Sequence, residues 1–483
     1  MSSRCLGILE PADLFQHLVV FGATGCGKTR HVILPLLREL LARDAGSPEL
    51  RAGALVFDVK GDMAGHIRAV MHAAGRTDEL ITIGRGGNAW FDPFLSLEKD
   101  SRAVTERLME MVRAMHTLGS SSNDDFWVEN LRRFLQVAVV LARATTLGDL
   151  HGLSGIAKAT SAIIAIGSSA HGDDDGDNKD ASLFERLLAS LDHAEKLKLL
   201  PNDQVSMARE YLKTEAQDLA ANTWSTITNY AQAYVSCLQD STLAKILSPG
   251  SGVQFFPEQI IDQGRIVLVS LSRVHFGAGS EVFRTLIKTA FQQAALQRHC
   301  LQYFDGKTIR PVNSTRPVLF VADEFPSLLT TGNADDGDAF FFDKCRETKI
   351  ACILSAQGVS AMAARMRNPS RVNHLLNNCC TKVFMASDCP ETLGYFDSSV
   401  PVDEPGFDTI LHQVPAAPSF RLPNYEFAEP ARWVAASRSE SRDLIRKYRS
   451  SVLRQLETGE AVVLRPKGLA ERLKLPPFLP QEL

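Results

Sequence analysis

The fold is decided by the stretch Gly22-Ala23-Thr24-Gly25-Cys26-Gly27-Lys28-Thr29. It fits G-x-x-x-x-G-K-T, follows an apolar run at 18–21, and precedes an apolar segment starting near Arg30. A strand, a glycine loop and a helix in that order aim backbone N–H groups and a helix N-terminus at phosphate oxygens. In such a loop Lys28 bridges the β- and γ-phosphates, and Thr29 holds Mg²⁺. The stretch predicts a P-loop that binds ATP and Mg²⁺.

Short apolar runs recur on both sides of this loop and are typical of buried parallel strands. Helical stretches separate most of them, which is the pattern of an α/β fold with crossover helices. The runs that we expect to be strands are Leu18–Phe21, Ala54–Asp58, Leu80–Ile83, Arg265–Leu271, Pro317–Asp323, Ala351–Ser355, Lys382–Ala386 and Glu460–Leu464.

The region from about 101 to 238 differs, because its apolar residues have helical spacing and no convincing strand interrupts them. We expect helices at 102–115, 126–143, 182–200 and 203–238. The polar stretch 171–180 is expected to be a solvated loop, and 333–339 is a second polar insertion. The chain is therefore divided into 1–100 and 241–483, two parts of a nucleotide-binding domain, and 101–240, an inserted all-α domain.

Composition narrows the class of protein. Hydrophobic residues at 45% and charged residues at 22% are typical of globular chains, and no apolar run is long enough for a membrane span. The nine cysteines form no C-x-x-C pair, which favours a reduced, cytoplasmic compartment over a disulfide framework or a zinc site. The net charge of −4 argues against a surface coated for nucleic acid, although a locally basic channel is compatible with it.

Two further strand ends carry polar groups suited to nucleotide hydrolysis. The apolar run 318–322 ends in Asp323 and Glu324. This suits a Walker B element, with Asp323 organising Mg²⁺ and Glu324 polarising the attacking water as general base. Gln357 ends the stretch Ile353-Leu354-Ser355-Ala356-Gln357 and is placed to sense the γ-phosphate, from a strand between those of the P-loop and Asp323.

Arginines supply the remaining candidates. Arg346 lies eleven residues before Gln357, where an arginine of a ring ATPase often reaches the neighbouring subunit's nucleotide. Candidate DNA contacts are Arg365, Arg367 and Arg371, with a solvated helix face as the equal alternative. The charged stretch 437–456, expected to be a helix, mixes arginines with acidic residues, so a salt-bridged surface is the better interpretation there. A proline-rich tail is expected from Pro466.

These residues together resemble one family, the coupling proteins of type IV secretion and conjugation (TraG/TraD), within the FtsK–HerA class of hexameric pumps. Besides the P-loop, Phe57-Asp58-Val59-Lys60-Gly61-Asp62 is similar to the family's D-P-K-G-[DE] signature, with Val59 in place of proline. The segment 378–384 followed by Ser387-Asp388 resembles the family's N-C-x-T-K strand and S-D turn, and Trp90-Phe91-Asp92-Pro93 and Phe126-Trp127 also correspond. The resemblance extends from about 14 to 466.

The resemblance implies a RecA-like nucleotide-binding domain, an inserted all-α domain, a homo-hexamer and ATP hydrolysis between subunits. It also implies DNA or a relaxase-linked or secreted protein as substrate, and a type IV secretion channel as partner. Lys60 is then expected near the nucleotide or the subunit interface.

Family members usually begin with two transmembrane helices, whereas about sixteen residues precede the first expected strand here. We expect a cytoplasmic protein that reaches the inner membrane, if at all, through partners. A soluble HerA-like DNA translocase working with a nuclease, or a nucleotide-gated platform for protein substrates, remains the alternative.

Overall fold

The computed structural model describes residues 7–9, 11–91, 101–115, 124–144, 152–171, 178–238, 243, 246, 252–277, 279–304, 309–330, 337–366, 369–400, 448–466 and 469–479. Arg367, most of the expected helix at 437–456, and parts of the polar stretches 171–180 and 333–339 lie outside these ranges. The boundaries expected at 100/101 and 240/241 also fall there, so the division into domains stays a prediction.

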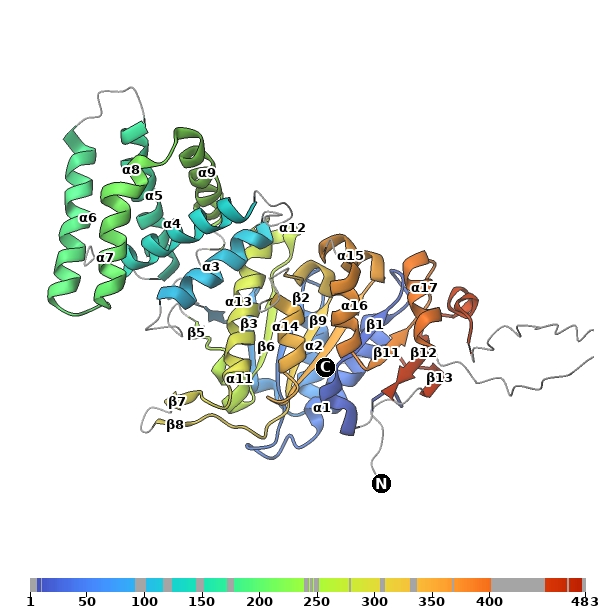
Figure 1. Ribbon diagram of the computed structural model, residues 1–483. Helices are drawn as coiled ribbons and strands as arrows, with labels where there is room; N and C mark the ends of the chain where they lie inside the picture. The colour runs from blue at the N-terminus through green and yellow to red at the C-terminus, as the bar shows by residue number, and fades with distance from the viewer. Residues whose placement is uncertain are drawn as a thin grey trace, which may run out of the picture.

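A nine-stranded sheet forms the centre of the molecule (Figure 1), in the order β13-β12-β11-β1-β10-β9-β2-β6-β3. Its strands are β1 Leu18–Phe21, β2 Gly53–Asp58, β3 Leu80–Gly84, β6 Ile266–Ser270, β9 Val318–Asp323, β10 Ile350–Ala356, β11 Thr381–Phe384, β12 Glu460–Arg465 and β13 Leu469–Lys474. Two small sheets pair β4 Ala89–Trp90 with β5 Val253–Gln254, and β7 Gln302–Phe304 with β8 Ile309–Pro311.

Seven neighbouring strands of the large sheet, from β11 to β3, run parallel. Two expectations at the other end are corrected. β12 is antiparallel to β11, although its apolar run reads like the parallel strands. The proline-rich tail contains the edge strand β13, in which Ala470 is buried and most other side chains face outward. An edge strand lacks the double-sided burial that marks the central ones.

Both faces of the sheet are buried, which explains the uninterrupted apolar runs. Along β1, Val19 and Phe21 join the core on one face, whereas Leu18 and Val20 join the core on the other. Helices α1 (Leu34–Ala42) and α2 (Ala64–Ala73) supply apolar side chains to the second core. The first core is covered by α11 Glu258–Gln263, α13 Gly279–Leu296, α14 Gly337–Lys344, α15 Val359–Met366, α16 Pro369–Asn378 and α17 Pro390–Ser399.

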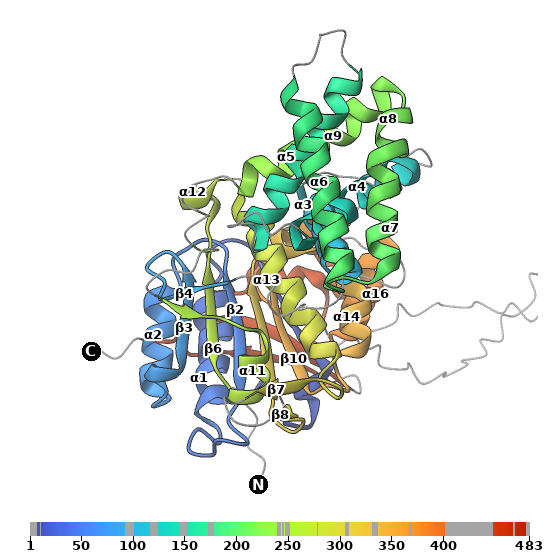
Figure 2. The ribbon, with the colours of Figure 1, turned by 90° about the vertical axis from the view of Figure 1, so that its left-hand side faces the viewer.

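The remaining helices form a lobe beside the sheet (Figures 1 and 2). They are α3 Ser101–Met115, α4 Asp124–Ala144, α5 Gly152–His171, α6 Asn178–Lys196, α7 Asn202–Glu210, α8 Ala216–Asp218 and α9 Ala221–Leu238. The helix expected at 203–238 is interrupted near Leu219, whose backbone is extended. Helix α5 is a further difference, because no helix was expected at 152–171. The lobe is joined to the sheet's helices through α3, which packs on α13 with Arg107 donating to Gln293.

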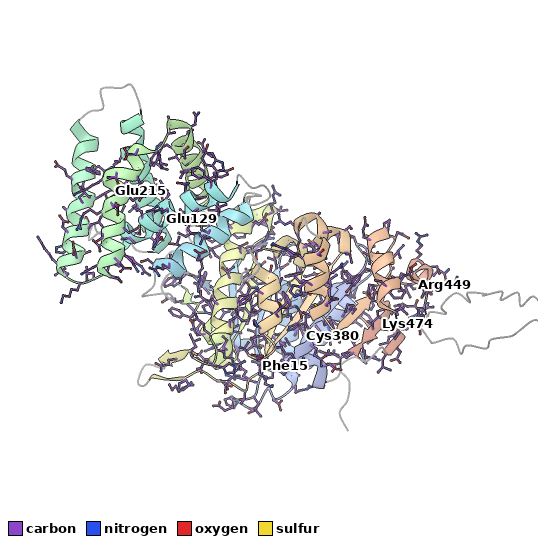
Figure 3. The ribbon with its side chains drawn as sticks, viewed as in Figure 1. Phe15, Glu129, Glu215, Cys380, Arg449 and Lys474 are labelled. Atoms are coloured by element: carbon purple, nitrogen blue, oxygen red, sulfur yellow. The ribbon has the colours of Figure 1, made fainter. Side chains whose placement is uncertain are left out.

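The parallel strands give the sheet two different edges. Figure 1 shows α12 (Arg273–Phe276), which follows the carboxyl end of β6, at the top of the sheet, on the side of the helical lobe. Figure 3 labels Phe15 and Cys380 at the bottom; they precede β1 and β11 and mark the amino edge. Loops that follow the carboxyl ends of parallel strands are the usual place for a ligand in such sheets.

Candidate nucleotide-binding site

The P-loop leaves the carboxyl end of β1 and is pinned at its start by the Ala23 amide, which donates to the Ala386 carbonyl at 2.7 Å. Gly25 and Gly27 adopt φ values of 85° and 99°. A Cβ atom on Gly27 would also lie 2.6 Å from the His31 ring, so both backbone shape and space require glycine there. The sulfur of Cys26 is buried in the core, and therefore only the backbone of that residue is available to a ligand.

Lys28 begins a short π-helical turn (Lys28–Ile33) that continues into α1. Its ammonium donates to the carbonyls of Gly22 at 2.7 Å and Ala23 at 3.0 Å. Burial lowers the pKa of Lys28 below its ordinary value, against the opposing charges of Asp323 and Glu324. The ammonium therefore rests on the loop's own carbonyls, which a phosphate oxygen can replace as acceptor.

The hydroxyl of Thr29 donates to a carboxylate oxygen of Asp323 at 2.8 Å. Only β10 separates β1 from β9 in the sheet, and this brings together residues that are 294 positions apart. A hydroxyl beside a carboxylate offers the hard oxygen ligands that Mg²⁺ prefers. The donor set thus fits the magnesium ion that the sequence predicts.

Glu324 follows β9 directly and has a left-handed backbone, with φ 61° and ψ 49°, which is uncommon for a residue with a side chain. Its Oε1 atom accepts from the Lys60 ammonium at 2.9 Å and from the Gln357 amide at 3.2 Å. Residues from three strand ends, those of β9, β2 and β10, therefore meet at one oxygen atom.

The loop that carries Lys60 is shaped by a residue to which the sequence assigns no role. Both oxygens of the buried Asp58 carboxylate accept backbone N–H groups, from Gly61 at 2.8 Å, Asp62 at 3.2 Å and Met63 at 3.1 Å. Burial raises the pKa of Asp58, although the bonds from Gly61 and Met63 and the Ser270 hydroxyl oppose the shift. An aspartate at a strand end, followed three residues later by a glycine, is the available signal for such a loop.

A hollow of about 450 Å³ opens beside the P-loop. It is bounded by the start of that loop and by the loops after β10 and β11, and its lining residues are Ala23, Thr24, Gln357, Gly358, Ser360, Ala361, Ser387, Asp388 and Cys389. Three of these residues, Ala23, Thr24 and Gln357, were predicted from sequence to bind or sense the nucleotide. The Ser387-Asp388 turn lines it too, although no ligand role was predicted for that turn.

Arg346 lies at the other edge of the sheet. It follows α14 in an exposed turn, and its carbonyl accepts a hydrogen bond from the backbone amide of Lys349. The side-chain ammonium of Lys349 lies 5.2 Å from the ring centroid of Phe15, which marks the amino edge of the sheet. The seven residues of β10, roughly 20 Å, separate this turn from Gln357. Arg346 is therefore not part of its own chain's site, and its role at a neighbouring subunit stays a prediction.

Of the three arginines predicted to contact DNA, the structure gives partners for Arg365. Arg365 on α15 pairs with Glu281 and donates to the Pro326 carbonyl at 3.3 Å. A cation already matched by a carboxylate contributes less to a phosphate contact, which weakens this prediction. Arg371 is exposed on α16, and Arg367 lies outside the described residues.

One buried group has the composition of a metal site, namely His17, Cys345 and Cys352, whose potential ligand atoms lie within 4.8 Å of one another. However, Nδ1 of His17 accepts from the Cys352 amide at 3.2 Å, and Nε2 faces the Cys345 sulfur at 3.4 Å. A neutral ring that accepts at Nδ1 carries its proton on Nε2 and has no lone pair there for a metal. The contacts instead suit a hydrogen bond to the Cys345 sulfur.

Comparisons with known proteins agree on one group. Residues 7–400 match the family described as Type IV secretory system Conjugative DNA transfer. The fold is similar to the plasmid coupling protein TrwB in complex with the GTP analogue GDPNP, with a TM-score of 0.56, 14% identity, and 99% of this chain and 89% of that chain covered. TrwB in complex with ADP and Mg²⁺ gives a TM-score of 0.55 at 14% identity, with the same coverage.

A trigonal form of the conjugative coupling protein TrwB with sulphate gives a TM-score of 0.58 at 15% identity, covering 98% of this chain and 89% of that one. No curated protein matches the sequence. The structural likeness shows the predicted fold, a RecA-like nucleotide-binding domain with an all-α domain. Since the family match covers most of its length, this chain belongs to the type IV secretion family of conjugative DNA transfer proteins.

Proposed function

We propose that this chain is an ATP-hydrolysing motor of the coupling type, which works as a homo-hexamer and moves DNA or a DNA-linked protein toward a type IV secretion channel. The observation that carries the proposal is the convergence of Thr29, Asp323 and Glu324 beside the P-loop lysine. Family membership and the nucleotide complexes of the similar protein TrwB support it.

In the proposed reaction, backbone amides of the P-loop and the Lys28 ammonium hold the phosphates. Thr29 and Asp323 are the residues that would hold Mg²⁺, which neutralises charge on the phosphates when it is bound. Glu324 orients the attacking water and accepts its proton, while Gln357 contacts the terminal phosphate from the neighbouring strand. Arg346 of an adjacent subunit stabilises charge in the transition state.

The part of the chain that the structure describes contains no helix that is both long and apolar enough to cross a bilayer. We propose that any attachment to the inner membrane depends on partner proteins.

The test measures ATP turnover and oligomeric mass with and without single- and double-stranded DNA. Wild-type protein is expected to hydrolyse ATP, and DNA to raise the rate. Lys28→Ala should lose nucleotide binding, and Glu324→Gln should bind ATP without hydrolysing it. Wild-type turnover in either variant refutes the assigned chemistry. If DNA leaves the rate unchanged while a protein substrate raises it, the motor gives way to a recruitment platform.

The proposed role of Arg346 is tested by a pair of variants. Arg346→Ala should keep nucleotide binding but lose hydrolysis in assembled rings, whereas the control Lys344→Ala, two residues away and also exposed, should leave both unchanged. Full hydrolysis by rings of the Arg346 variant would assign the trans contact to another arginine.

A further inference from the structure

One carboxylate oxygen of the general base proposed above is already occupied in this structure. Two donors, the Lys60 ammonium and the Gln357 amide, converge on its Oε1 atom at 2.9 and 3.2 Å. A carboxylate oxygen has about two acceptor sites, so an oxygen that already accepts from two donors has no site left for a hydrogen bond from the attacking water. The arrangement therefore restrains the base that hydrolysis needs.

Lys60 itself has room to leave. Its side chain is 46% exposed, and Glu324 is its ion-pair partner within the described ranges. The backbone around it is held by Asp58 through three N–H bonds, so the flexible four-carbon stem is the part that can swing. The ammonium can change partner without any rearrangement of the loop.

Lys60 lies beside the residues that would hold Mg²⁺, because its partner Glu324 directly follows Asp323, and Asp323 accepts from the Thr29 hydroxyl at 2.8 Å. Burial alone lowers the pKa of Lys60, but its bond to Glu324 and the charges of Glu324 and Asp323 raise it above the ordinary value. Lys60 therefore stays charged in the same field as the groups that would hold the phosphates and Mg²⁺.

We propose that Lys60 exchanges partners, holding Glu324 while no triphosphate is bound and moving to the terminal phosphate when one arrives. The exchange frees one of the two acceptor sites of Oε1, to which the attacking water can then donate, only when there is a phosphate to transfer. A terminal phosphate carries more negative charge than one carboxylate and binds an ammonium more strongly. The inference rests on the proposed function and adds a role for Lys60 as the residue that positions the base.

A double-mutant cycle on nucleotide affinity tests the exchange without relying on turnover. Dissociation constants for ADP and for a non-hydrolysable ATP analogue, both with Mg²⁺, are measured by calorimetry for wild type, Lys60→Met, Glu324→Gln and the double variant. Lys60→Met should weaken the analogue by about two- to fivefold, the range for a partly exposed ion pair, and leave ADP unchanged. Glu324→Gln should tighten the analogue, because the competing carboxylate is gone.

The decisive quantity is how much Glu324→Gln tightens the analogue in each background. Partner exchange predicts a larger gain when Lys60 is present than in Lys60→Met, because only Lys60 can be released to the phosphate. Simple repulsion between Glu324 and the phosphate predicts the reverse, since Lys60 then shields that repulsion. The proposal is overturned if Glu324→Gln tightens analogue binding in the Lys60→Met background as much as, or more than, it does when Lys60 is present. It is also overturned if Lys60→Met weakens the binding of ADP and of the analogue equally.

Three further variants complete the design. Lys60→Arg keeps the charge and should restore the preference for triphosphate, and failure to do so counts against the exchange. Lys344→Met removes an exposed ammonium at the opposite edge and should change no affinity. Lys28→Ala separates the two hypotheses. If it binds nucleotide normally the proposed function fails, whereas if it loses binding while the cycle shows the repulsion pattern, only the partner exchange fails.

Discussion

The turn that carries Glu324 is anchored by an ion pair in the interior, and this pair makes a quantitative prediction possible. Lys288 on α13 and Asp338 on α14 are both completely buried. The Lys288 ammonium donates to both Asp338 oxygens, at 2.8 and 2.7 Å, to the Leu328 carbonyl at 2.7 Å and to the Thr330 hydroxyl at 2.9 Å. Leu328 ends the short helical turn that begins at Phe325, directly after Glu324.

Lys288→Met removes the cation and leaves the Asp338 carboxylate with three neutral donors: the Gln292 side-chain amide and the Thr330 amide, both at 2.8 Å, and the Thr330 hydroxyl at 3.2 Å. Removing one partner of a buried pair typically costs about 3–5 kcal/mol, because the other charge is left uncompensated. We expect a loss of that size in the free energy of unfolding. Lys288→Met/Asp338→Leu should recover most of it, since no buried charge remains.

Urea titration followed by circular dichroism measures both free energies. The control is Arg209→Met, which removes two partly exposed ion pairs, with Asp192 and Glu195, in the helical lobe and should cost less than about 1 kcal/mol. Lys288→Met should also lower kcat for ATP more than it alters nucleotide affinity, because it loosens the turn that carries the base. A loss under about 1 kcal/mol, or a double variant as unstable as the single one, refutes the reasoning.

Three other predictions concern the P-loop and its surroundings. Gly27→Ala should abolish nucleotide binding measured by calorimetry, because the added Cβ meets the His31 ring at 2.6 Å and φ is 99°; retained binding would show that the loop can reshape. Thr29→Val should weaken Mg²⁺-dependent nucleotide affinity by roughly tenfold or more while Thr29→Ser keeps it, and equal behaviour of the two variants would exclude a role for the hydroxyl. Burial opposes ionisation of Cys389, but hydrogen bonds, including one to Ser360 at 3.1 Å, lower its pKa. Cys389 should therefore react with iodoacetamide faster near neutral pH than an unperturbed thiol. Because Cys389 lines the hollow, bound ATP should slow this labelling, which mass spectrometry of the labelled peptide measures. Labelling at the same rate with and without ATP would place the nucleotide elsewhere.

Much of the sheet follows from local pattern alone. The eight expected runs coincide with strands to within two residues at each end, and Gln357 follows a strand that lies between those of the P-loop and Asp323, as expected. Burial on both faces makes a strand uniformly apolar, so its residues identify it without knowledge of its neighbours. The pattern fails where burial is one-sided or weak, as in the edge strand β13.

In the helical region, too, the apolar pattern fails where the contrast between buried and exposed residues is weak. Helix α5 (Gly152–His171) is rich in alanine, serine and glycine, and small residues give a weak contrast between its buried and exposed faces. The expected helix at 203–238 carries helical spacing throughout, yet the chain turns at Leu219. Helix α9 packs against α4 and α5, and this tertiary contact places the break in the chain. The local sequence pattern does not predict it.

The residues of the site were nameable from sequence, but their partners were not. Gly22–Thr29 and the acidic end of β9 are local features, because glycine conformation and strand burial depend on neighbours along the chain. The contacts of Glu324 with Lys60, and of Thr29 with Asp323, join residues 264 and 294 positions apart. Such contacts depend on which strands become neighbours, and the whole sheet determines that order. By itself, the sequence determined the kind of site; the tertiary structure decided which charges meet in it.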